Sequence, residues 1–412
     1  MFKVLNKKKA PAVSKFAVLG GTSRQSQPNT ITLSREWRNI EVLSEIAKGD
    51  YSRAHEFTGF GGLHKALQNE DVQGALMDLL SAEEWESLRK STSTAYYTSP
   101  EIIKYCWQIV EQLGFAGGDI LEPACGIGSF FEYMPESMRQ RSAITGIELE
   151  KVTAHIASSL YQDVTIINNG FQHHKGEYDL LIGNPPYASF SVNDRYFPEL
   201  NDFRIHHAFL ARSIKLLREG GLCVMVVPSY CLDNSTSHAR ALISEEADLL
   251  YAYRLPDSIW ADTKITTDIV VFQKTSNPAK DWQGISAIEL DCGYTDNLSD
   301  YYIKHPEHLL GKLEKYEVWL SKEQRKRRGL SVSGSMTEVM AKLPSLIDDI
   351  EPVCSGQGAI EGCVIDFKQK VVHDGDESEK ADTGDYGVLS ARLDAVVQEL
   401  AEITRLLQQQ AA

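Results

Sequence analysis

The sequence lacks the cysteine patterns that mark a disulfide framework or a zinc motif. Its seven cysteines are odd in number and scattered along the chain, and no two of them form a CxxC pair. This spacing argues against a small secreted fold held by disulfides, and we predict no metal site. A reducing compartment, the cytoplasm, is the expected location.

A long apolar run is also missing. Nowhere do about eighteen apolar residues follow one another, which is the minimum for a membrane-spanning helix. The first 25 residues contain six basic residues but no apolar stretch of the length that a secretory signal needs. We therefore expect a soluble protein without a membrane span.

Positive charge is in short supply, since the formal net charge is -15 at pH 7. A protein that coats nucleic acid non-specifically depends on Lys and Arg to release counterions from phosphates, so that class is disfavoured. The charge is uneven, however, with acids concentrated at 374–379 and basic residues clustered at the N-terminus and at 322–328. Phosphate contacts are possible at the two basic clusters, although a solvated tail and a solvated helix face are the alternatives. The basic candidates are Lys7, Lys8, Lys9, Arg325, Arg327 and Arg328.

The chain divides into segments of different composition. Residues 1–30 are basic and rich in Ser, Gln, Gly and Pro, which predicts a flexible arm. Residues 31–94 have apolar residues at helical spacing, interrupted by the glycine-rich loop Phe57–Leu63, whose backbone can approach a ligand closely. An α/β domain is expected over 95–275. An irregular accessory region, with a helical stretch near 308–328, is expected over 276–380.

The last segment, 381–412, is expected to be a linker followed by an amphipathic helix. Its apolar residues alternate at spacings of four and three, which is the a/d pattern of a coiled coil. A short coiled coil would make the protein a homodimer, and a helix docked on its own domain is the alternative. The residues of this seam are Leu389, Leu393, Val396, Leu400, Ile403 and Leu407.

Between residues 119 and 274, short apolar strands alternate with helical stretches. This order is typical of an α/β fold with a doubly wound, mostly parallel sheet of seven strands. The last two strands are joined by too little chain for a helix, so the final strand should run antiparallel. The expected strands are 120–122, 143–147, 164–167, 178–182, 222–227, 249–254 and 268–273.

Three strand ends carry residues suited to an adenine-containing cofactor. Gly126 and Gly128 permit a tight turn after the first strand, where a backbone can approach a ligand closely. Glu148 ends the second strand, and a carboxylate at that position can accept hydrogen bonds from two ribose hydroxyls. Asn169 follows the third strand and can bond an adenine amine, with Phe171 nearby. A plain Asn-Gly turn is an equal alternative at that point.

The fourth strand ends in Asn184, Pro185, Pro186 and Tyr187. The prolines fix the backbone, so the Pro185 carbonyl and the Asn184 amide oxygen can both accept hydrogen bonds from one amino group. Tyr187 offers a flat face on which a planar ring can stack. These four residues are the expected catalytic group, and alignment with an electrophile would activate the amine without a metal.

With these residues identified, the chain resembles the gamma-class DNA adenine amino-methyltransferases of the TaqI type over about residues 95–275. The resemblance covers Tyr96–Pro100 (YYTSP), the glycine turn, the acidic second strand, NPPY, the segment His207–Pro228, and LPDSIWADTKITTDIVVFQK from Leu255. It departs from the family at Gly170, where an acidic residue is common. Phe57–Leu63 (FTGFGGL) is similar to a motif of plasmid and phage proteins, so we expect a bacterial, phage or plasmid gene.

This resemblance implies S-adenosylmethionine as the cofactor and the N6 amine of adenine in double-stranded DNA as the methyl acceptor. The adenine would be flipped out of the duplex and held between Tyr187 and Trp260. Without the resemblance, a core tryptophan is the favoured interpretation of Trp260. The expected cofactor-binding residues are Tyr97, Thr98, Pro100, Glu122, Pro123, Ala124, Cys125, Gly126, Gly128, Glu148, Asn169, Phe171 and Asn184.

Three other functions fit the same residues. Protein glutamine N5-methyltransferases also use an NPPY segment, but they generally lack a YYTSP element and a long extension after the last strand. An RNA base amine fits the pocket equally well. An inactive anti-restriction or DNA-binding protein is the non-enzyme alternative, and the intact Gly126, Gly128, Glu148 and NPPY argue against it.

Overall fold

The computed structural model describes residues 34–92, 97–235, 238–260, 264–319 and 326–354, all within a compact unit that spans Met1–Ile360. The predicted basic arm (1–30), the acidic segment 374–379 and the C-terminal heptad helix lie outside the described residues. What we expect of them, a homodimer included, stays a prediction. No helix within the described ranges is long and apolar enough to cross a membrane.

The N-terminal region is helical, as predicted. Asn69 caps α2 by accepting hydrogen bonds from two backbone N–H groups, and Ser81 forms a capping box with Glu84 at the start of α3. The predicted apolar residues Ile40, Leu43 and Ile46 are buried in a core shared with α7. The elements are α1 (Arg35–Ile46), the 3₁₀ turns Ala54–Glu56 and Ala66–Gln68, α2 (Glu70–Leu79) and α3 (Ala82–Ser91).

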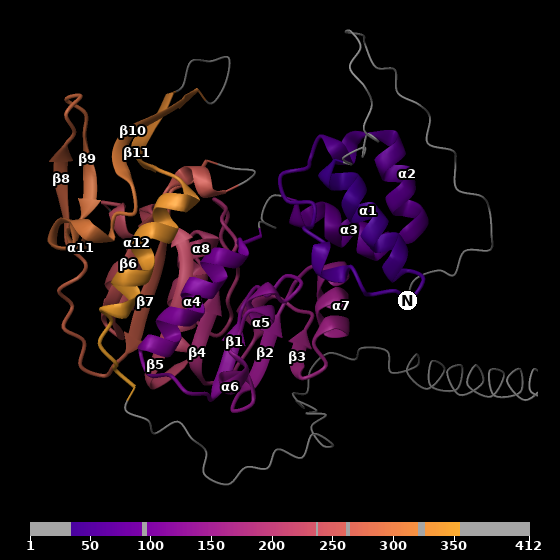
Figure 1. Cartoon of the computed structure of the whole chain (residues 1–412), viewed down its shortest axis with the longest axis horizontal. Helices are drawn as coiled ribbons and strands as arrows, with labels where there is room; N and C mark the ends of the chain where they lie inside the picture. Colours follow the sequence, from indigo (N-terminus) through magenta and orange to yellow (C-terminus); the bar gives the residue numbers. More distant parts are fainter. Residues whose placement is uncertain (1–33, 93–96, 236–237, 261–263, 320–325, 355–412) are drawn as a thin grey trace, which may run out of the picture. The chain divides into compact units, whose positions relative to one another are not determined.

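A seven-stranded sheet forms the centre of the molecule, in the order β3-β2-β1-β4-β5-β7-β6 (Figure 1). β7 pairs antiparallel with both β5 and β6, and the pairings from β3 across to β5 are parallel. Each predicted strand is present, and the antiparallel final strand is confirmed. The strands are β1 (Asp119–Glu122), β2 (Ala143–Ile147), β3 (Val164–Ile167), β4 (Tyr178–Gly183), β5 (Leu217–Pro228), β6 (Ala247–Leu255) and β7 (Thr267–Lys274).

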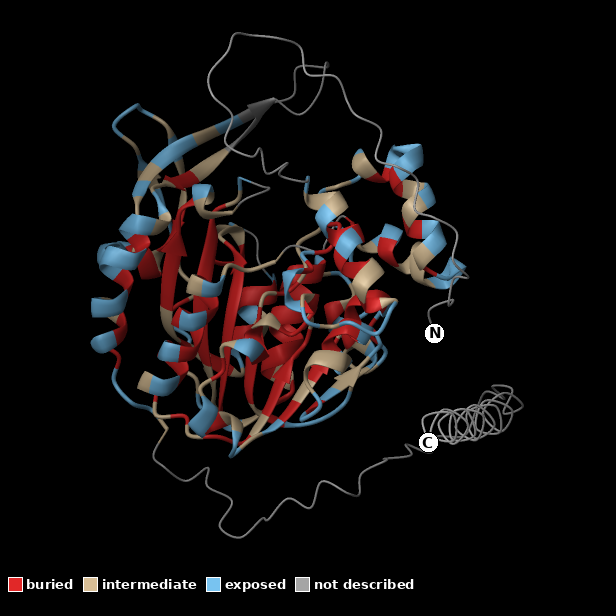
Figure 2. Ribbon diagram, turned by 45° about the vertical axis from the view of Figure 1, so that its right-hand side comes forward, coloured by how far each residue is buried: buried red, intermediate tan, exposed pale blue. Residues whose placement is uncertain are grey.

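Both faces of this sheet are buried, which is why its central strands read as continuous apolar runs (Figure 2). Ile120 and Leu180 belong to the core under α4 and α12, whereas their neighbours Leu121 and Leu181 belong to the core under α8. The covering elements are α4 (Pro100–Gln112), α5 (Ser129–Glu132), α6 (Glu136–Arg139), α7 (Lys151–Leu160), α8 (Ile205–Lys215), α9 (Tyr230–Asp233) and α10 (His238–Ser244), with 3₁₀ turns at Phe171–His173, Pro198–Leu200 and Asp257–Ile259.

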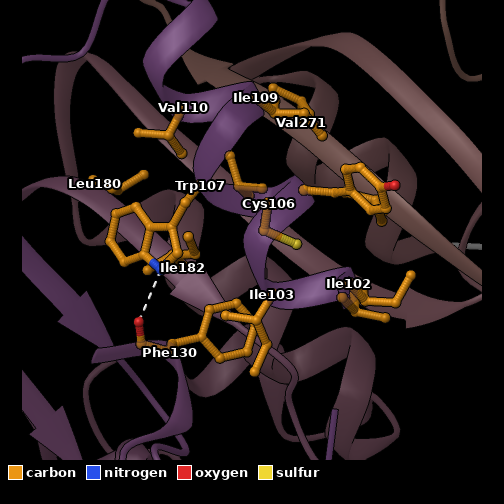
Figure 3. Packing of buried hydrophobic residues seen from close by; sticks show 14 of the residues in the cluster. Ile102, Ile103, Cys106, Trp107, Ile109, Val110, Phe130, Leu180, Ile182 and Val271 are labelled. Atoms are coloured by element: carbon orange, nitrogen blue, oxygen red, sulfur yellow. Dashed lines mark hydrogen bonds between the residues drawn. The ribbon is translucent and has the colours of Figure 1, made fainter. Parts of the chain in front are cut away.

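Trp107 on α4 anchors one of these cores. Its ring is buried among Val110, Leu180 and Ile182, and its Nε1–H donates to the Phe130 carbonyl over 2.8 Å (Figure 3). This bond connects α4 to the segment after the glycine turn. Truncation of such a residue to alanine typically costs about 3–5 kcal/mol of stability, so α4 is held firmly against the sheet.

The described part of the accessory region, 276–319 and 326–354, forms regular elements, so the prediction of an irregular segment with a helix near 308–328 was wrong. Leu309, Leu313 and Tyr316 have helical spacing, but the ladder between β10 and β11 overrides it. Arg327 and Arg328 therefore lie on a strand, opposite Val318 and Glu317. The elements are β8 (Ile285–Glu289), β9 (Thr295–Ser299), α11 (Asp300–Lys304), the 3₁₀ turn Pro306–His308, β10 (Lys312–Trp319), β11 (Lys326–Ser333) and α12 (Met336–Asp348).

Candidate active site

A cavity of about 960 Å³ opens at the carboxyl edge of the parallel strands. This volume lies at the upper end of the range of about 300–1,000 Å³ that is common for ligand sites. All of the predicted cofactor residues line it except Pro100, which begins α4, and Gly128. The predicted lining residues are Tyr97, Thr98, Glu122, Pro123, Ala124, Cys125, Gly126, Glu148, Asn169, Phe171 and Asn184.

The two glycines of the turn after β1 have different roles. Gly126 lines the cavity with φ 56°, and its N–H donates to Glu148 Oε2 over 3.0 Å. Gly128 has φ 88°, and a Cβ there would lie only 2.5 Å from the Tyr161 ring. Gly126 therefore faces the cavity, whereas Gly128 permits close packing of the turn and does not line the cavity.

Three carboxyl groups gather on one side of the cavity. Glu148 accepts the N–H groups of Gly126 and Glu150, at 3.0 and 2.7 Å, yet burial raises its pKa to about 7. Burial, with the charge of Glu148, also raises the pKa of Glu122, whose Oε2 has no hydrogen-bond partner in the described chain. Burial raises the pKa of Glu150 as well. The buried Oε2 of Glu122, which has no partner in the described chain, favours a cationic or hydroxyl-bearing ligand.

Asn184 joins the two halves of the site. Its Nδ2–H donates to Thr98 Oγ1 over 3.0 Å, so the predicted YYTSP and NPPY segments are in direct contact. The Tyr187 hydroxyl lies 2.5 Å from Asn184 Oδ1 and 2.7 Å from the Val226 carbonyl. A hydroxyl has one proton, so it donates to one of these oxygens at a time. The Asn184 oxygen thus keeps acceptor capacity, and its orientation is fixed by Thr98.

The remaining NPPY residues and Trp260 lie around this junction. Pro186 lines the cavity, Pro185 is buried, and neither Tyr187 nor Trp260 belongs to the cavity lining. Trp260 is half-buried, and its Nε1–H donates to Thr267 Oγ1 over 3.2 Å. Thr267 pairs with Pro228 on β5, two residues beyond the carbonyl that Tyr187 reaches. Both aromatic residues are thus attached to the same end of β5 and β7.

The turn after β3 agrees only in part with its predicted role. Asn169 lines the cavity, but its Oδ1 accepts the N–H of Gly170 over 2.8 Å, as in a simple Asn-Gly turn. Phe171 is buried against Phe209, with ring centroids 5.0 Å apart. A Cβ at Gly170 would lie 2.6 Å from Gln172, so an acidic side chain there would require Gln172 to move.

Helix α3 forms a wall of the cavity that no sequence pattern predicts. Ser87, Lys90 and other residues of this helix line the cavity. The Lys151 N–H donates to Ser87 Oγ over 3.1 Å, and Lys151 also pairs with Glu83. Helical periodicity identified the helix but not the surface that it faces. None of the residues in the loop Phe57–Leu63 lines the cavity, although Gly59 packs directly on Tyr97.

The predicted phosphate-contact residues are not brought to the cavity by any described contact. Lys7, Lys8, Lys9 and Arg325 lie outside the described residues, and Arg327 and Arg328 are placed only as part of the β11 backbone.

Comparison with known proteins finds a similar family for the middle of the chain. Residues 81–258 match the model of the Eco57I restriction-modification methylases. Defense against restriction protein B of Escherichia phage P1 is 25% identical over 276 residues, which are 63% of this chain and 11% of that protein. The type II methyltransferase M.TthHB8I of Thermus thermophilus is 23% identical over 197 residues, or 43% of this chain and 44% of the relative.

The chain is also similar to one further curated relative and to a solved structure. The modification methylase CviBIII of Paramecium bursaria Chlorella virus NC1A is 30% identical over 149 residues, 34% of this chain and 39% of the relative. A methyltransferase subunit of the type I restriction-modification system of Streptococcus thermophilus aligns with a TM-score of 0.39 and 19% identity, over 66% of this chain and 62% of that one. The chain spans about a tenth of the phage P1 protein and less than half of the two other curated relatives.

Residues 81–258 therefore resemble the Eco57I restriction-modification methylases, and this segment contains strands β1 to β6 of the seven-stranded, mostly parallel sheet.

Proposed function

We propose that this protein transfers a methyl group from S-adenosylmethionine to the N6 amine of adenine in DNA, after flipping the base into the NPPY pocket. The observation that carries this proposal is the position of Asn184 between the two halves of the site. Its amide nitrogen bonds Thr98 in the cavity wall, and its amide oxygen lies on the Tyr187 side. Asn184 Oδ1 is therefore a hydrogen-bond acceptor of fixed orientation, and it lies between the cavity and the rest of the NPPY segment.

The residues present fit the cofactor. S-adenosylmethionine carries a sulfonium and an ammonium, and the cavity contains Glu122 with an unpartnered, buried Oε2. Glu148 uses each carboxyl oxygen once for a backbone N–H, so each retains capacity for a ribose hydroxyl. Asn169 and Phe171 would face the adenine ring. When bound, this group supplies an electrophilic methyl on sulfur.

The chain's own residues would activate the acceptor by position. Asn184 Oδ1 and the Pro185 carbonyl would accept the two amine hydrogens, which leaves the nitrogen lone pair directed toward the cavity. Tyr187, anchored by its hydroxyl at the Val226 carbonyl, would present its ring to the base from one side. Trp260 would stack from the other side. Alignment of two reactants in this way can supply about 7–11 kcal/mol of the barrier reduction.

Double-stranded DNA is the proposed substrate because the family match is to restriction-modification methylases. An exocyclic amine is inaccessible inside a stacked duplex, so an enzyme of this kind must extrude the base. Adenine is the proposed base because the YYTSP, NPPY and Trp260 pattern resembles the adenine amino-methyltransferases.

Transfer of a labelled methyl group tests the proposal. The full-length protein is incubated with labelled S-adenosylmethionine and equal amounts of unmethylated duplex DNA, RNA or bacterial protein extract. We expect label in DNA, recovered as N6-methyladenine on nucleoside analysis. Label found only in RNA or protein, or in cytosine, would end the proposal. Long-read detection of modified adenines in a methylation-free host expressing the chain then reports the sequence context.

The phage P1 match favours a second candidate, which concerns biological role. That relative is named for defence against restriction, and it matches 63% of this chain. An inactive anti-restriction protein and a protective methyltransferase differ in one measurement. Protection of DNA from cleavage should be lost in Asn184→Ala if methylation is the means, and kept if the protein acts only by binding.

A further inference from the structure

Two adjacent histidines and a cysteine come together beside the NPPY segment. His206 and His207 lie in the first turn of α8, and Cys231 lies in α9. All three are buried, and one candidate ligand atom from each lies within 4.8 Å of the other two. The histidines and the cysteine are separated by more than twenty residues in the sequence, so no motif connects them and only the fold brings them together.

The imidazole nitrogens of this cluster are short of partners. Within the described chain, neither nitrogen of His206 has a hydrogen bond of good geometry, and His207 Nε2 has none. The Ala188 backbone lies close enough to His206 to raise its pKa slightly, but burial dominates. Leaving such a buried group unsatisfied costs about 1–3 kcal/mol. A ligand that bonds to these nitrogens would remove that cost from both rings.

Both rings can supply a metal ligand from the interior of the protein. A neutral imidazole has one nitrogen lone pair available. The ring centroids are 4.5 Å apart, and Tyr230 packs edge-on against His206. The surroundings therefore hold the two rings together.

We propose that His206, His207 and Cys231 bind a Zn²⁺ ion. Imidazole nitrogen and thiolate sulfur are ligands that zinc prefers, and three protein ligands leave a fourth position for a small ligand. Bond lengths of about 2.0–2.3 Å place the ligand atoms of a tetrahedral site about 3.3–3.8 Å apart. The three atoms lie within 4.8 Å of one another, so they must approach by at most about 1.5 Å on binding.

The two aspartates and two arginines near the cluster balance each other in charge. Affinity for a metal ion must therefore come from the histidine and cysteine ligands themselves. Asp233 and Asp268 both bond Arg254, at 2.6 and 2.8 Å, and Arg240 lies close enough to Cys231 to act on it electrostatically. Burial and Asp268 raise the pKa of the Cys231 thiol, so it is protonated in the free protein. Metal binding would displace that proton and leave the sulfur as thiolate.

The site would connect the two segments that flank Tyr187. His206 contacts the backbone of Ala188, the residue after Tyr187, and Cys231 and Tyr230 are close enough to Tyr187 to raise its pKa electrostatically. A bound ion would fix the start of α8 to α9 across the NPPY segment. This inference concerns metal binding alone and does not rest on the proposed methyl transfer.

Cobalt substitution tests the site directly. The full-length protein, in a Cys292→Ser background because Cys292 is exposed, is stripped with a chelator and titrated with Co²⁺. We expect one equivalent to bind, with a thiolate-to-cobalt absorption band that Zn²⁺ displaces. Cys231→Ser should lose this band, whereas Cys223→Ser should keep it. Cys223 is an equally buried cysteine on β5 outside the cluster, so it controls for the packing change.

Two outcomes would overturn the proposal. One is the absence of stoichiometric Zn²⁺ from the unmodified protein after equilibrium dialysis, a result that does not depend on any variant folding. The other is a thiolate band that persists in Cys231→Ser. His207→Gln gives an independent check, since it should weaken Co²⁺ binding at least tenfold and abolish the rise in melting temperature that Zn²⁺ produces. Either result can be read whether or not the protein methylates DNA.

Discussion

The side chains of Asn184 and Tyr187 are hydrogen-bonded to each other, so each restricts the orientation of the other. Asn184→Ala removes the proposed acceptor for the amine, and we expect turnover to fall about a hundredfold or more, as for loss of one group from a preorganised polar site. Cofactor affinity, measured by calorimetry, should change only a few fold because the Glu148 side of the cavity is untouched. Loss of cofactor binding in a folded variant would mean that Asn184 serves mainly to bind the cofactor and not the substrate amine.

Tyr187→Phe and Tyr187→Ala separate the ring from its hydroxyl. The phenylalanine variant keeps the stacking face and loses only the bond to Val226 or Asn184, so turnover should fall about three- to tenfold, equivalent to ~0.5–1.5 kcal/mol. The alanine variant should lose most of its activity. Equal losses in the two variants would mean that the hydroxyl, and not the ring, carries the function.

Trp260 is expected to hold the flipped base by stacking. Trp260→Ala should weaken trapping of the base, seen as a smaller fluorescence increase with 2-aminopurine at the target position. Trp260→Phe keeps an aromatic face but loses the Nε1–H bond to Thr267, so it should retain most of the signal. Stacking of a base on an aromatic ring is worth about 1–3 kcal/mol. An alanine variant with the wild-type signal would leave Trp260 as a core residue.

The raised pKa of Glu148 makes the stability of the free protein depend on pH. Between the ordinary glutamate pKa of 4.5 and about 7, the folded protein binds more protons at this site than the unfolded chain does. Stability should therefore fall as the pH rises through that window. Glu122 and Glu150 are shifted in the same direction and add to the trend.

Glu148→Gln should flatten this dependence, measured as the free energy of unfolding in denaturant at several pH values. Glu41→Gln is the matched control because Glu41 is exposed on α1, away from the cavity. The change of unfolding free energy with pH is compared between the variants, and not its absolute value. The reason is that the glutamine also changes the hydrogen bonds to Gly126 and Glu150, which alters stability at every pH. A slope that Glu148→Gln leaves unchanged would contradict the assigned protonation.

At the scale of elements, α3 couples the N-terminal helical region to the cofactor cavity. Lys90 and Arg89 are neighbours on this helix and both pair with Glu86, but only Lys90 lines the cavity. Lys90→Ala should raise the dissociation constant for S-adenosylmethionine several fold, whereas Arg89→Ala should not, as measured by calorimetry. Equal effects of the two changes would show that α3 acts through its own stability and not through contact with the ligand.

The sequence predicted the sheet better than the surfaces around it, and the reason is physical. Strand position follows from local apolar runs such as YDLLIG, and the carboxyl edge of a parallel sheet then brings Glu122, Glu148 and Asn184 together. The wall formed by α3 depends on the docking of two regions, which no local pattern encodes. The β10–β11 hairpin was misread because helical spacing and strand pairing compete in the same residues, and only the ladder decides between them.

Within the site, the types of residue were easier to predict than their partners. The pairing of Gly126 with Glu148 follows from adjacent strand ends, so spacing was sufficient. The pairing of Asn184 with Thr98 joins segments 86 residues apart, and it depends on how α4 packs on the sheet. The type of residue was not sufficient at Gly128, which was predicted to bind the cofactor but packs against Tyr161. In a sequence, a glycine needed for close packing cannot be distinguished from a glycine needed beside a ligand.

At the scale of the whole molecule, the net charge of -15 must be reconciled with the nucleic-acid substrate that we propose. Binding in such a case depends on a small number of local basic contacts, because the remaining surface repels phosphate. Each phosphate contact contributes about 0.9 to the slope of log affinity against log salt concentration. The predicted contact residues Arg327 and Arg328 lie on β11, within the accessory region.

Arg327→Gln combined with Arg328→Gln should lower that slope by about 1.8, if each makes one phosphate contact. The measurement is DNA affinity over a range of salt concentrations. Arg141→Gln with Lys175→Gln removes the same charge from exposed positions just before β2 and β4, at the opposite edge of the sheet from the cavity. This control should leave the slope nearly unchanged. Equal decreases in both double variants would mean that overall charge, and not contact at β11, governs DNA binding, and the accessory hairpin would lose its proposed role.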